Sequence, residues 1–219
     1  RVTEASLKLT GLLALPAGIG LAVLSYPIVN VLYPGSHTEG PALLTFLGVA
    51  SFFVCLTLIT NAVLQAYGYE RFPVYTLSIG GIIKIVVTWI LVSNPDIAVR
   101  GAAIGTLSCY VVISIINIIL IYLKLPEKPS LIRLMIKPVL ATLVMGVSAY
   151  LLYNFLQRLL SGVGMDPEGR GVMLLAMAAS IIASVVIYLV MIIVLRAITK
   201  EDLAMIPKGN KIAKLLRLK

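Results

Sequence analysis

A charged side chain lies in the middle of an apolar stretch of the sequence, residues 73–93. The charge is Lys84, and at about 1.5 Å per helical residue the stretch can cross a hydrocarbon core of about 30 Å. A lysine inside a membrane costs on the order of 2.5–3.5 kcal/mol and usually faces a helix-bundle interior or a watery cavity. On a helix, Thr76, Gly80 and Thr88 share its face at steps of four residues. We expect Lys84 to line a cavity; the alternative is that it snorkels or pairs structurally.

A second polar stripe occurs in the preceding apolar stretch, residues 42–67. An amide side chain in hydrocarbon needs hydrogen-bond partners, so this stripe faces other helices or a cavity rather than lipid. Interhelical hydrogen bonding and substrate contact both remain open as interpretations. The connection at 68–73 is short, so we expect the two stretches to form a tight antiparallel pair whose stripes could line one surface. The candidate substrate-binding residues are Lys84, Asn61, Gln65, Thr57, Thr88 and Thr76.

The elements that carry these residues are membrane-spanning helices. The chain has 219 residues, of which 60% are hydrophobic and only 12% charged, with a mean hydropathy of +1.04. A soluble domain is nearer 25% charged, so the composition predicts an integral membrane protein. The apolar runs do not alternate as barrel strands do, so the predicted fold class is all-α. The six predicted spans are residues 7–33, 42–67, 73–93, 99–123, 134–155 and 172–195.

The basic residues predict the orientation of the chain. If the first residues are cytoplasmic, fourteen of the eighteen lysines and arginines fall inside, three fall outside, and Lys84 stays in the membrane. The formal charge of +9 then reflects topology rather than nucleic-acid binding. We expect a unit of four helices at 1–123, a cytoplasmic linker at 124–133, two further helices at 134–195, and a basic cytoplasmic tail at 196–219. Because the chain begins with Arg1 rather than Met, we also expect it to be a fragment that lacks a partner half.

Individual residues refine the expected helices. Pro16 and Pro27 predict that the first span is bent or broken, since a proline inside a helix removes a backbone donor. Gly101 and Gly105 form a small-xxx-small face, where we expect the closest helix packing. The last two spans are poor in strongly polar side chains, which suits contact with lipid chains.

The motifs of common enzymes are missing from the sequence. There is no phosphate-binding loop, dinucleotide fingerprint or zinc-protease motif, and every acidic residue falls outside the predicted spans. Cys55 and Cys109 lie in apolar runs and are interpreted as small buried hydrophobes. We therefore expect no enzymatic activity, no catalytic residues, no metal and no cofactor.

Several stretches resemble a known family of transporters. The similar stretches are residues 14–34 (ALPAGIGLAVLSYPIVNVLYP), 60–74 (TNAVLQAYGYERFPV), 80–92 (GGIIKIVVTWILV), 99–112 (VRGAAIGTLSCYVV) and 200–212 (KEDLAMIPKGNKI). Together they resemble the C-terminal half of stage V sporulation protein B and its polysaccharide-transporter relatives. These belong to the multidrug/oligosaccharidyl-lipid/polysaccharide (MOP) exporter superfamily, which includes the lipid II flippases.

The resemblance implies a MATE-like fold of fourteen helices in two lobes around a V-shaped cavity, of which this chain forms most of the C-terminal lobe. In such flippases cavity cations attract a lipid-linked diphosphate, a role that Lys84 would fit, and the last two helices form a groove for the polyprenyl chain.

The implied function is translocation of a lipid-linked oligosaccharide or peptidoglycan precursor across the bacterial cytoplasmic membrane by alternating access. Alternatives are a multidrug/cation antiporter of the same superfamily and a non-transporting scaffold for cell-wall or spore-envelope assembly. The expected partners are the lipid-linked saccharide, the bilayer and the missing N-terminal lobe, with no nucleic acid.

Overall fold

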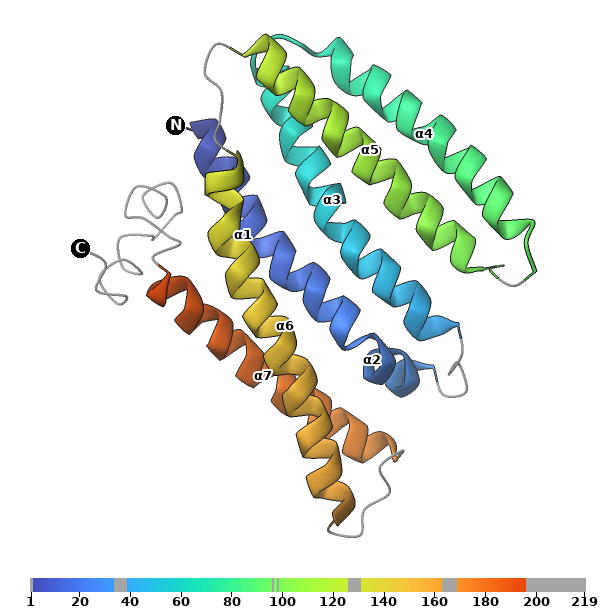
Figure 1. Cartoon of the computed structure of the whole chain (residues 1–219), viewed down its shortest axis with the longest axis vertical. Helices are drawn as coiled ribbons and strands as arrows, with labels where there is room; N and C mark the ends of the chain where they lie inside the picture. Colours follow the sequence, from blue (N-terminus) through green and yellow to red (C-terminus); the bar gives the residue numbers. More distant parts are fainter. Residues whose placement is uncertain are drawn as a thin grey trace.

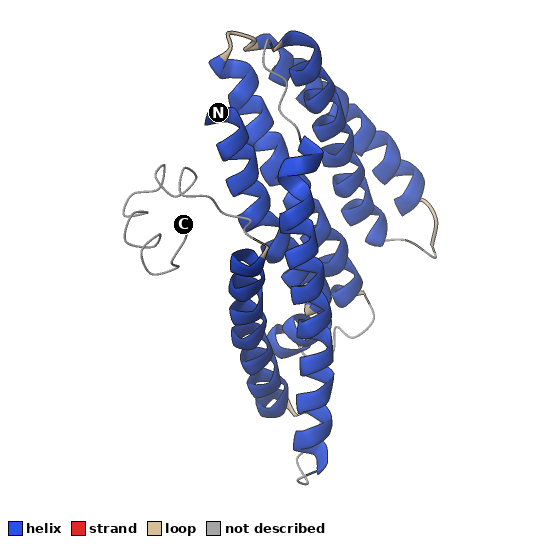
Figure 2. Cartoon of the chain, turned by 60° about the vertical axis from the view of Figure 1, so that its left-hand side comes forward, coloured by secondary structure: helices blue, strands red, loops and turns tan. Residues whose placement is uncertain are grey.

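The structure is a computed structural model that describes residues 2–33, 39–95, 97, 99–125, 131–162 and 169–195. These residues form seven α-helices and no strand (Figure 2). The predicted tail at 196–219 and residues 126–130 of the predicted linker at 124–133 lie outside the described residues. The helices are α1 (Val2–Val23), α2 (Ser25–Leu32), α3 (Gly40–Ala66), α4 (Arg71–Val92), α5 (Arg100–Lys124), α6 (Leu131–Gly162) and α7 (Arg170–Val194).

Six of these helices are long and apolar enough to cross a membrane, all but the eight-residue α2. The all-α membrane fold predicted from the sequence is therefore confirmed. The predicted spans match the helices within a few residues in most cases. The largest extension is in α6, which begins at Leu131 and ends at Gly162 rather than covering 134–155.

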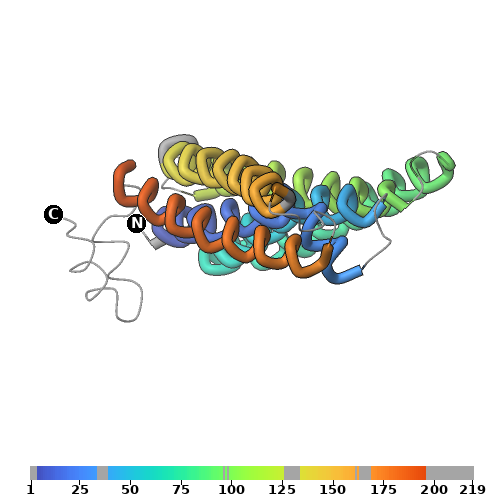
Figure 3. The backbone as a smooth tube through the Cα atoms, turned by 90° about the horizontal axis from the view of Figure 1, so that it is seen from below, coloured from blue at the N-terminus to red at the C-terminus, as the bar shows by residue number. Residues whose placement is uncertain are grey.

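The spanning helices lie side by side in a row. In the order α4, α5, α3, α1, α6, α7, each packs mainly against its immediate neighbours (Figure 1). Seen from below, the row is much wider than it is deep (Figure 3). A row of this kind has little interior, so most helices expose apolar side chains that suit lipid. At the edge of the row, only 11% of the most apolar part of α4 is buried.

The chain reverses direction at every span. The start of α1, the α3–α4 turn, the end of α5, the start of α6 and the end of α7 lie at one end of the molecule (Figure 1). The end of α2, the starts of α3, α5 and α7, and the ends of α4 and α6 lie at the other. This is the alternation on which the predicted orientation depends.

The predicted pairing of the second and third spans is wrong. Helices α3 and α4 make few contacts, and α5 lies between them, packing closely on both (Figure 1). At the starts of α3 and α5, Arg100 donates to both carboxylate oxygens of Glu39, from Nε at 2.7 Å and from Nη2 at 3.1 Å. A short connection brings only the ends of two helices together; here polar and small residues on α5 decide which faces meet.

The predicted interruption of the first span is confirmed, and it occurs near the second proline. Helix α1 runs through Pro16 and ends at Val23, and α2 starts after Leu24. Pro27 has no N–H to donate to the Val23 carbonyl, and its ring crowds that turn of the helix. The next bond is restored when the Ile28 N–H donates to the Leu24 carbonyl at 3.1 Å.

Glycines mark the closest approaches between helices. A Cβ on Gly101 would lie 2.8 Å from the Cβ of Leu91, and one on Gly105 would overlap the Thr88 hydroxyl, so close packing at the small-residue face is confirmed. A second approach was not predicted. At the α1–α3 crossing, a Cβ on Gly18 would lie 2.5 Å from the Gly48 carbonyl oxygen, and one on Gly48 would lie 2.7 Å from the Gly18 oxygen.

Candidate functional site

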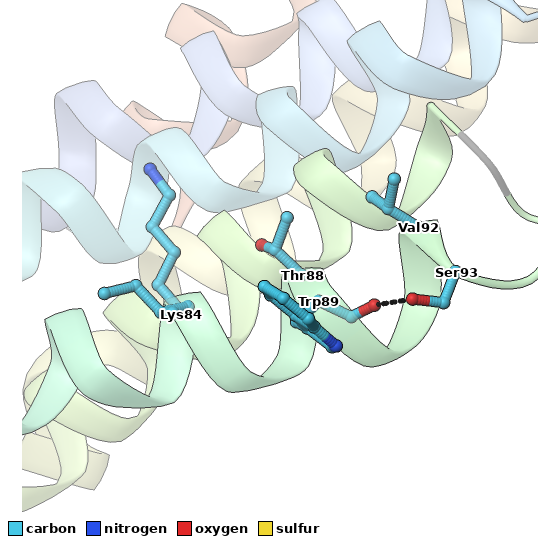
Figure 4. A pocket seen from close by; sticks show the side chains of 6 residues that line it. Lys84, Thr88, Trp89, Val92 and Ser93 are labelled. Carbon is cyan, nitrogen blue, oxygen red and sulfur yellow. Dashed lines mark hydrogen bonds between the residues drawn. The ribbon is translucent and has the colours of Figure 1, made fainter.

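Lys84 lies exposed on α4, at the edge of the row. It lines an open, one-sided cavity of about 580 Å³ together with Thr88, Trp89 and Ser93, and all the lining residues belong to α4 and its C-cap. Figure 4 shows Lys84 and Thr88 extending from the same side of the helix. Among the described residues Lys84 makes no hydrogen bond and no ion pair. Its ammonium group is therefore available to an anion or to a carboxylate from elsewhere.

The other side chains of this cavity add one exposed hydroxyl, that of Ser93, and an aromatic surface. The Thr88 hydroxyl is buried against Gly105 and has no hydrogen-bond partner in the described part of the chain. The Ser93 hydroxyl donates to the Trp89 carbonyl at 2.7 Å (Figure 4). Trp89 itself is 76% exposed. Trp89 was not among the residues selected from the sequence; its position beside Thr88 was the available signal for a place in the cavity.

The stripe around Lys84 does not form one continuous open surface. Thr76 is buried and donates to the Pro73 carbonyl at 3.2 Å. Gly80 is also buried, and a Cβ there would overlap Ile113 of α5. The first half of the stripe therefore belongs to the α4–α5 interface, and only Lys84 and Thr88 reach the cavity.

The polar stripe of α3 faces α5. Thr57 and Ser114 share a hydrogen bond of 3.1 Å between their hydroxyls. The Asn117 amide nitrogen donates to the Thr60 hydroxyl at 3.0 Å and to the Asn61 amide oxygen at 2.8 Å. All five side chains are buried. This is the interhelical hydrogen-bonding arrangement, one of the two interpretations left open by the sequence.

The six predicted site residues are thus distributed over four places. Lys84 and Thr88 line the cavity, and Thr76 is buried between α4 and α5. Thr57 and Asn61 are buried between α3 and α5, while Gln65 is exposed in the last turn of α3. Ser114 and Asn117 were not among the residues selected from the sequence. Their spacing of three residues on one helix face was the signal that could have identified them as partners of the α3 stripe.

A second, apolar cavity lies between α1, α6 and α7. It has a volume of about 630 Å³ and is lined almost entirely by aliphatic side chains. Its polar atoms come from Tyr188 and from Ser184, whose buried hydroxyl has no hydrogen-bond partner among the described residues. We refer to this cavity as the apolar groove. The residues of α1 that line it include Leu12, Leu13, Pro16 and Gly20, and those of α6 are Met145 and Ala149.

The sequence of this chain is similar to one membrane protein of a bacterium. It is 26% identical over 212 residues to the Uncharacterized membrane protein YabM of Bacillus subtilis (strain 168). The alignment covers 97% of this chain and 38% of the relative, so the chain spans about two fifths of the relative's length. No family model matches the sequence, and no solved structure matches it. The similarity and the six spanning helices agree that the chain is an all-helical membrane protein with several transmembrane segments.

Proposed function

We propose that this chain forms part of a flippase that moves a lipid-linked oligosaccharide or peptidoglycan precursor across the bacterial cytoplasmic membrane. The observation that carries the proposal is Lys84, a cation in the middle of a spanning helix that is exposed in an open cavity and unpaired among the described residues. A cation in this position is expensive unless it serves a pathway or a ligand. A lipid diphosphate would supply the matching negative charge.

The apolar groove supports the same proposal. A lipid-linked saccharide has an anionic, hydrated head and a long hydrocarbon chain. The cavity at Lys84 offers a cation, the exposed hydroxyl of Ser93 and an aromatic ring for the head, and the groove offers an aliphatic surface for the chain. The chain would remain in the hydrophobic layer while the head crosses, so no bond in the lipid need break and no ATP need be hydrolysed.

The proposed cycle is alternating access driven by an ion gradient or the membrane potential, with the start of α1 and the end of α7 on the cytoplasmic side. The basic residues favour this orientation. The other wall of the cavity would come from the rest of a longer protein, in line with the greater length of the Bacillus subtilis relative.

The test replaces Lys84 in the intact protein and follows the outward appearance of lipid-linked precursor in cells. We expect Lys84→Ala to abolish translocation at unchanged protein level, and Lys84→Arg to restore part of it, because arginine keeps the positive charge. The matched control is Lys124→Ala, which removes a lysine at the end of α5. Normal translocation in both Lys84 variants would contradict the proposal and leave Lys84 with a structural role, as in a scaffold.

A further inference from the structure

Pro16 leaves a backbone carbonyl of α1 without its usual donor. In an uninterrupted helix the N–H of residue 16 would donate to the carbonyl of Leu12, and proline has no N–H. Helix α1 nevertheless continues through Pro16 to Val23. A spanning helix tolerates such a proline when a neighbouring group satisfies the freed carbonyl, because the hydrocarbon core offers no water.

Tyr188 of α7 supplies the missing donor. Its hydroxyl donates to the Leu12 carbonyl at 2.6 Å, across 176 positions of the sequence, and the bond is buried. The Tyr188 side chain is 7% exposed and packs in one cluster with Leu12, Ala141 and Met145. The proline of one helix and the tyrosine of another therefore form a matched pair.

This bond crosses the apolar groove. Leu12, Pro16 and Tyr188 all line it, with Leu12 nearest the start of α1 and Tyr188 close to the end of α7. The main packing partners of α7 are α6 and α2, and those of α1 are α3 and α6. The Tyr188 hydroxyl is thus a polar connection between two helices that are otherwise held together mainly through α6 and α2.

We propose that Tyr188 is a positioning residue that ties α7 to α1, sets the width of the apolar groove and closes the groove at the end nearest the start of α1. The assignment of a lipid hydrocarbon chain to the groove rests on the proposed function. The hydrogen bond between α7 and α1 does not depend on that function. Without the hydroxyl, α7 is held to α1 by apolar contacts alone, and the groove can widen.

The test compares Tyr188→Phe with the parent protein in lipid nanodiscs. Nitroxide labels at Leu58 of α3 and Val186 of α7, both exposed, report the distance between α7 and the α1–α3 pair after Cys55 and Cys109 are replaced by Ala. We expect the distance distribution to lengthen and broaden, and the melting temperature to fall by about 2–4 °C. Photocrosslinking of an isoprenyl monophosphate with a photoreactive tail to the groove should fall by up to about fivefold.

Two further variants distinguish loss of the hydrogen bond between Tyr188 and Leu12 from a general effect of removing a buried hydroxyl. Tyr153→Phe is the matched control, because Tyr153 is equally buried and its hydroxyl has no hydrogen-bond partner among the described residues; it should change neither distance nor crosslinking. Pro16→Ala restores a donor to Leu12 within α1, so Tyr188→Phe no longer leaves that buried carbonyl unsatisfied and should lower the melting temperature less than it does when Pro16 is present.

The outcomes are distinguishable. An unchanged distance in Tyr188→Phe, or an equal fall in melting temperature caused by that substitution with and without Pro16→Ala, would overturn the proposal. If Tyr188→Phe still moves α7 but the parent protein does not crosslink the probe, the role of Tyr188 in holding α7 to α1 is supported. The use of the groove in lipid translocation is then contradicted.

Discussion

Two kinds of polar residue can be distinguished within the spanning helices. Asn117 is fully buried, and the two hydrogens of its amide nitrogen serve Thr60 and Asn61. Lys84 is exposed and has no such partner among the described residues. The first kind joins helices to one another, and the second is free to bind something from outside the helix row.

Replacing Asn117 with alanine should destabilise the packing of α3 on α5. The substitution leaves Thr60 and Asn61 without their donor, and interhelical hydrogen bonds in membranes contribute about 0.6–1.7 kcal/mol. Thermal or denaturant unfolding in detergent should show a loss of that size. The control is Ser78→Ala, because among the described residues the Ser78 hydroxyl bonds only to the Val74 carbonyl of its own helix. Equal stability of the two variants would show that the buried amide contributes nothing to the fold.

The sequence predicted that Thr57 and Asn61 avoid lipid, because an amide or hydroxyl in hydrocarbon needs a partner. It could not choose between a substrate and another helix as that partner. The choice depended on Asn117, which lies 56 positions further along the chain. The type of a residue indicates that its side chain must form a hydrogen bond, and the tertiary structure determines which group is the partner.

At the scale of helices, prolines and glycines determine shape. Both Pro16 and Pro27 were predicted to disturb the first span, and only the turn near Pro27 breaks. The rule that proline removes a donor applies equally to both. The difference is that Tyr188 satisfies the carbonyl freed by Pro16, and no local pattern in the first span could show this.

The crossing of α1 and α3 should be intolerant of any side chain. In Gly48→Ala the new Cβ would lie 2.7 Å from the Gly18 oxygen and 2.9 Å from the Ala22 nitrogen, both backbone atoms that cannot turn aside. We expect a loss of about 1–3 kcal/mol, measured by unfolding in detergent. Gly81→Ala is the matched control in α4, where a Cβ meets nothing within 4 Å. If Gly48→Ala is as stable as Gly81→Ala, α1 and α3 do not approach each other as closely at Gly48 as described.

At the scale of the whole molecule, the two cavities lie near opposite edges of the row. Between the cavity on α4 and the apolar groove beside α1 stand α5 and α3. At 8–10 Å between neighbouring helices, three steps correspond to roughly 25–30 Å. The fold class could be predicted from composition and span length, but this separation could not, because it depends on the order of helices in the row.

A lipid that occupies both cavities at once must have a long chain. We expect isoprenyl diphosphates of many units to compete with the natural precursor for the intact protein, and those of two or three units to compete far more weakly. Competition measured as inhibition of translocation in proteoliposomes, over a series of chain lengths, would show this. Equal potency of short and long chains would contradict simultaneous binding at the two places.

The position of α5 between α3 and α4 also affects the biosynthesis of the protein. Thr60 and Asn61 enter the membrane well before Asn117, their partner, has been made. At about 5–20 residues per second, the 56 residues that separate Asn61 from Asn117 take roughly 3–11 s to synthesise. During that interval α3 and α4 share the membrane without the helix that will divide them, and the amide of Asn61 lacks its Asn117 partner. The hydrogen bonds that join α3 to α5 can therefore form only after the chain has reversed direction twice more and α5 has been made.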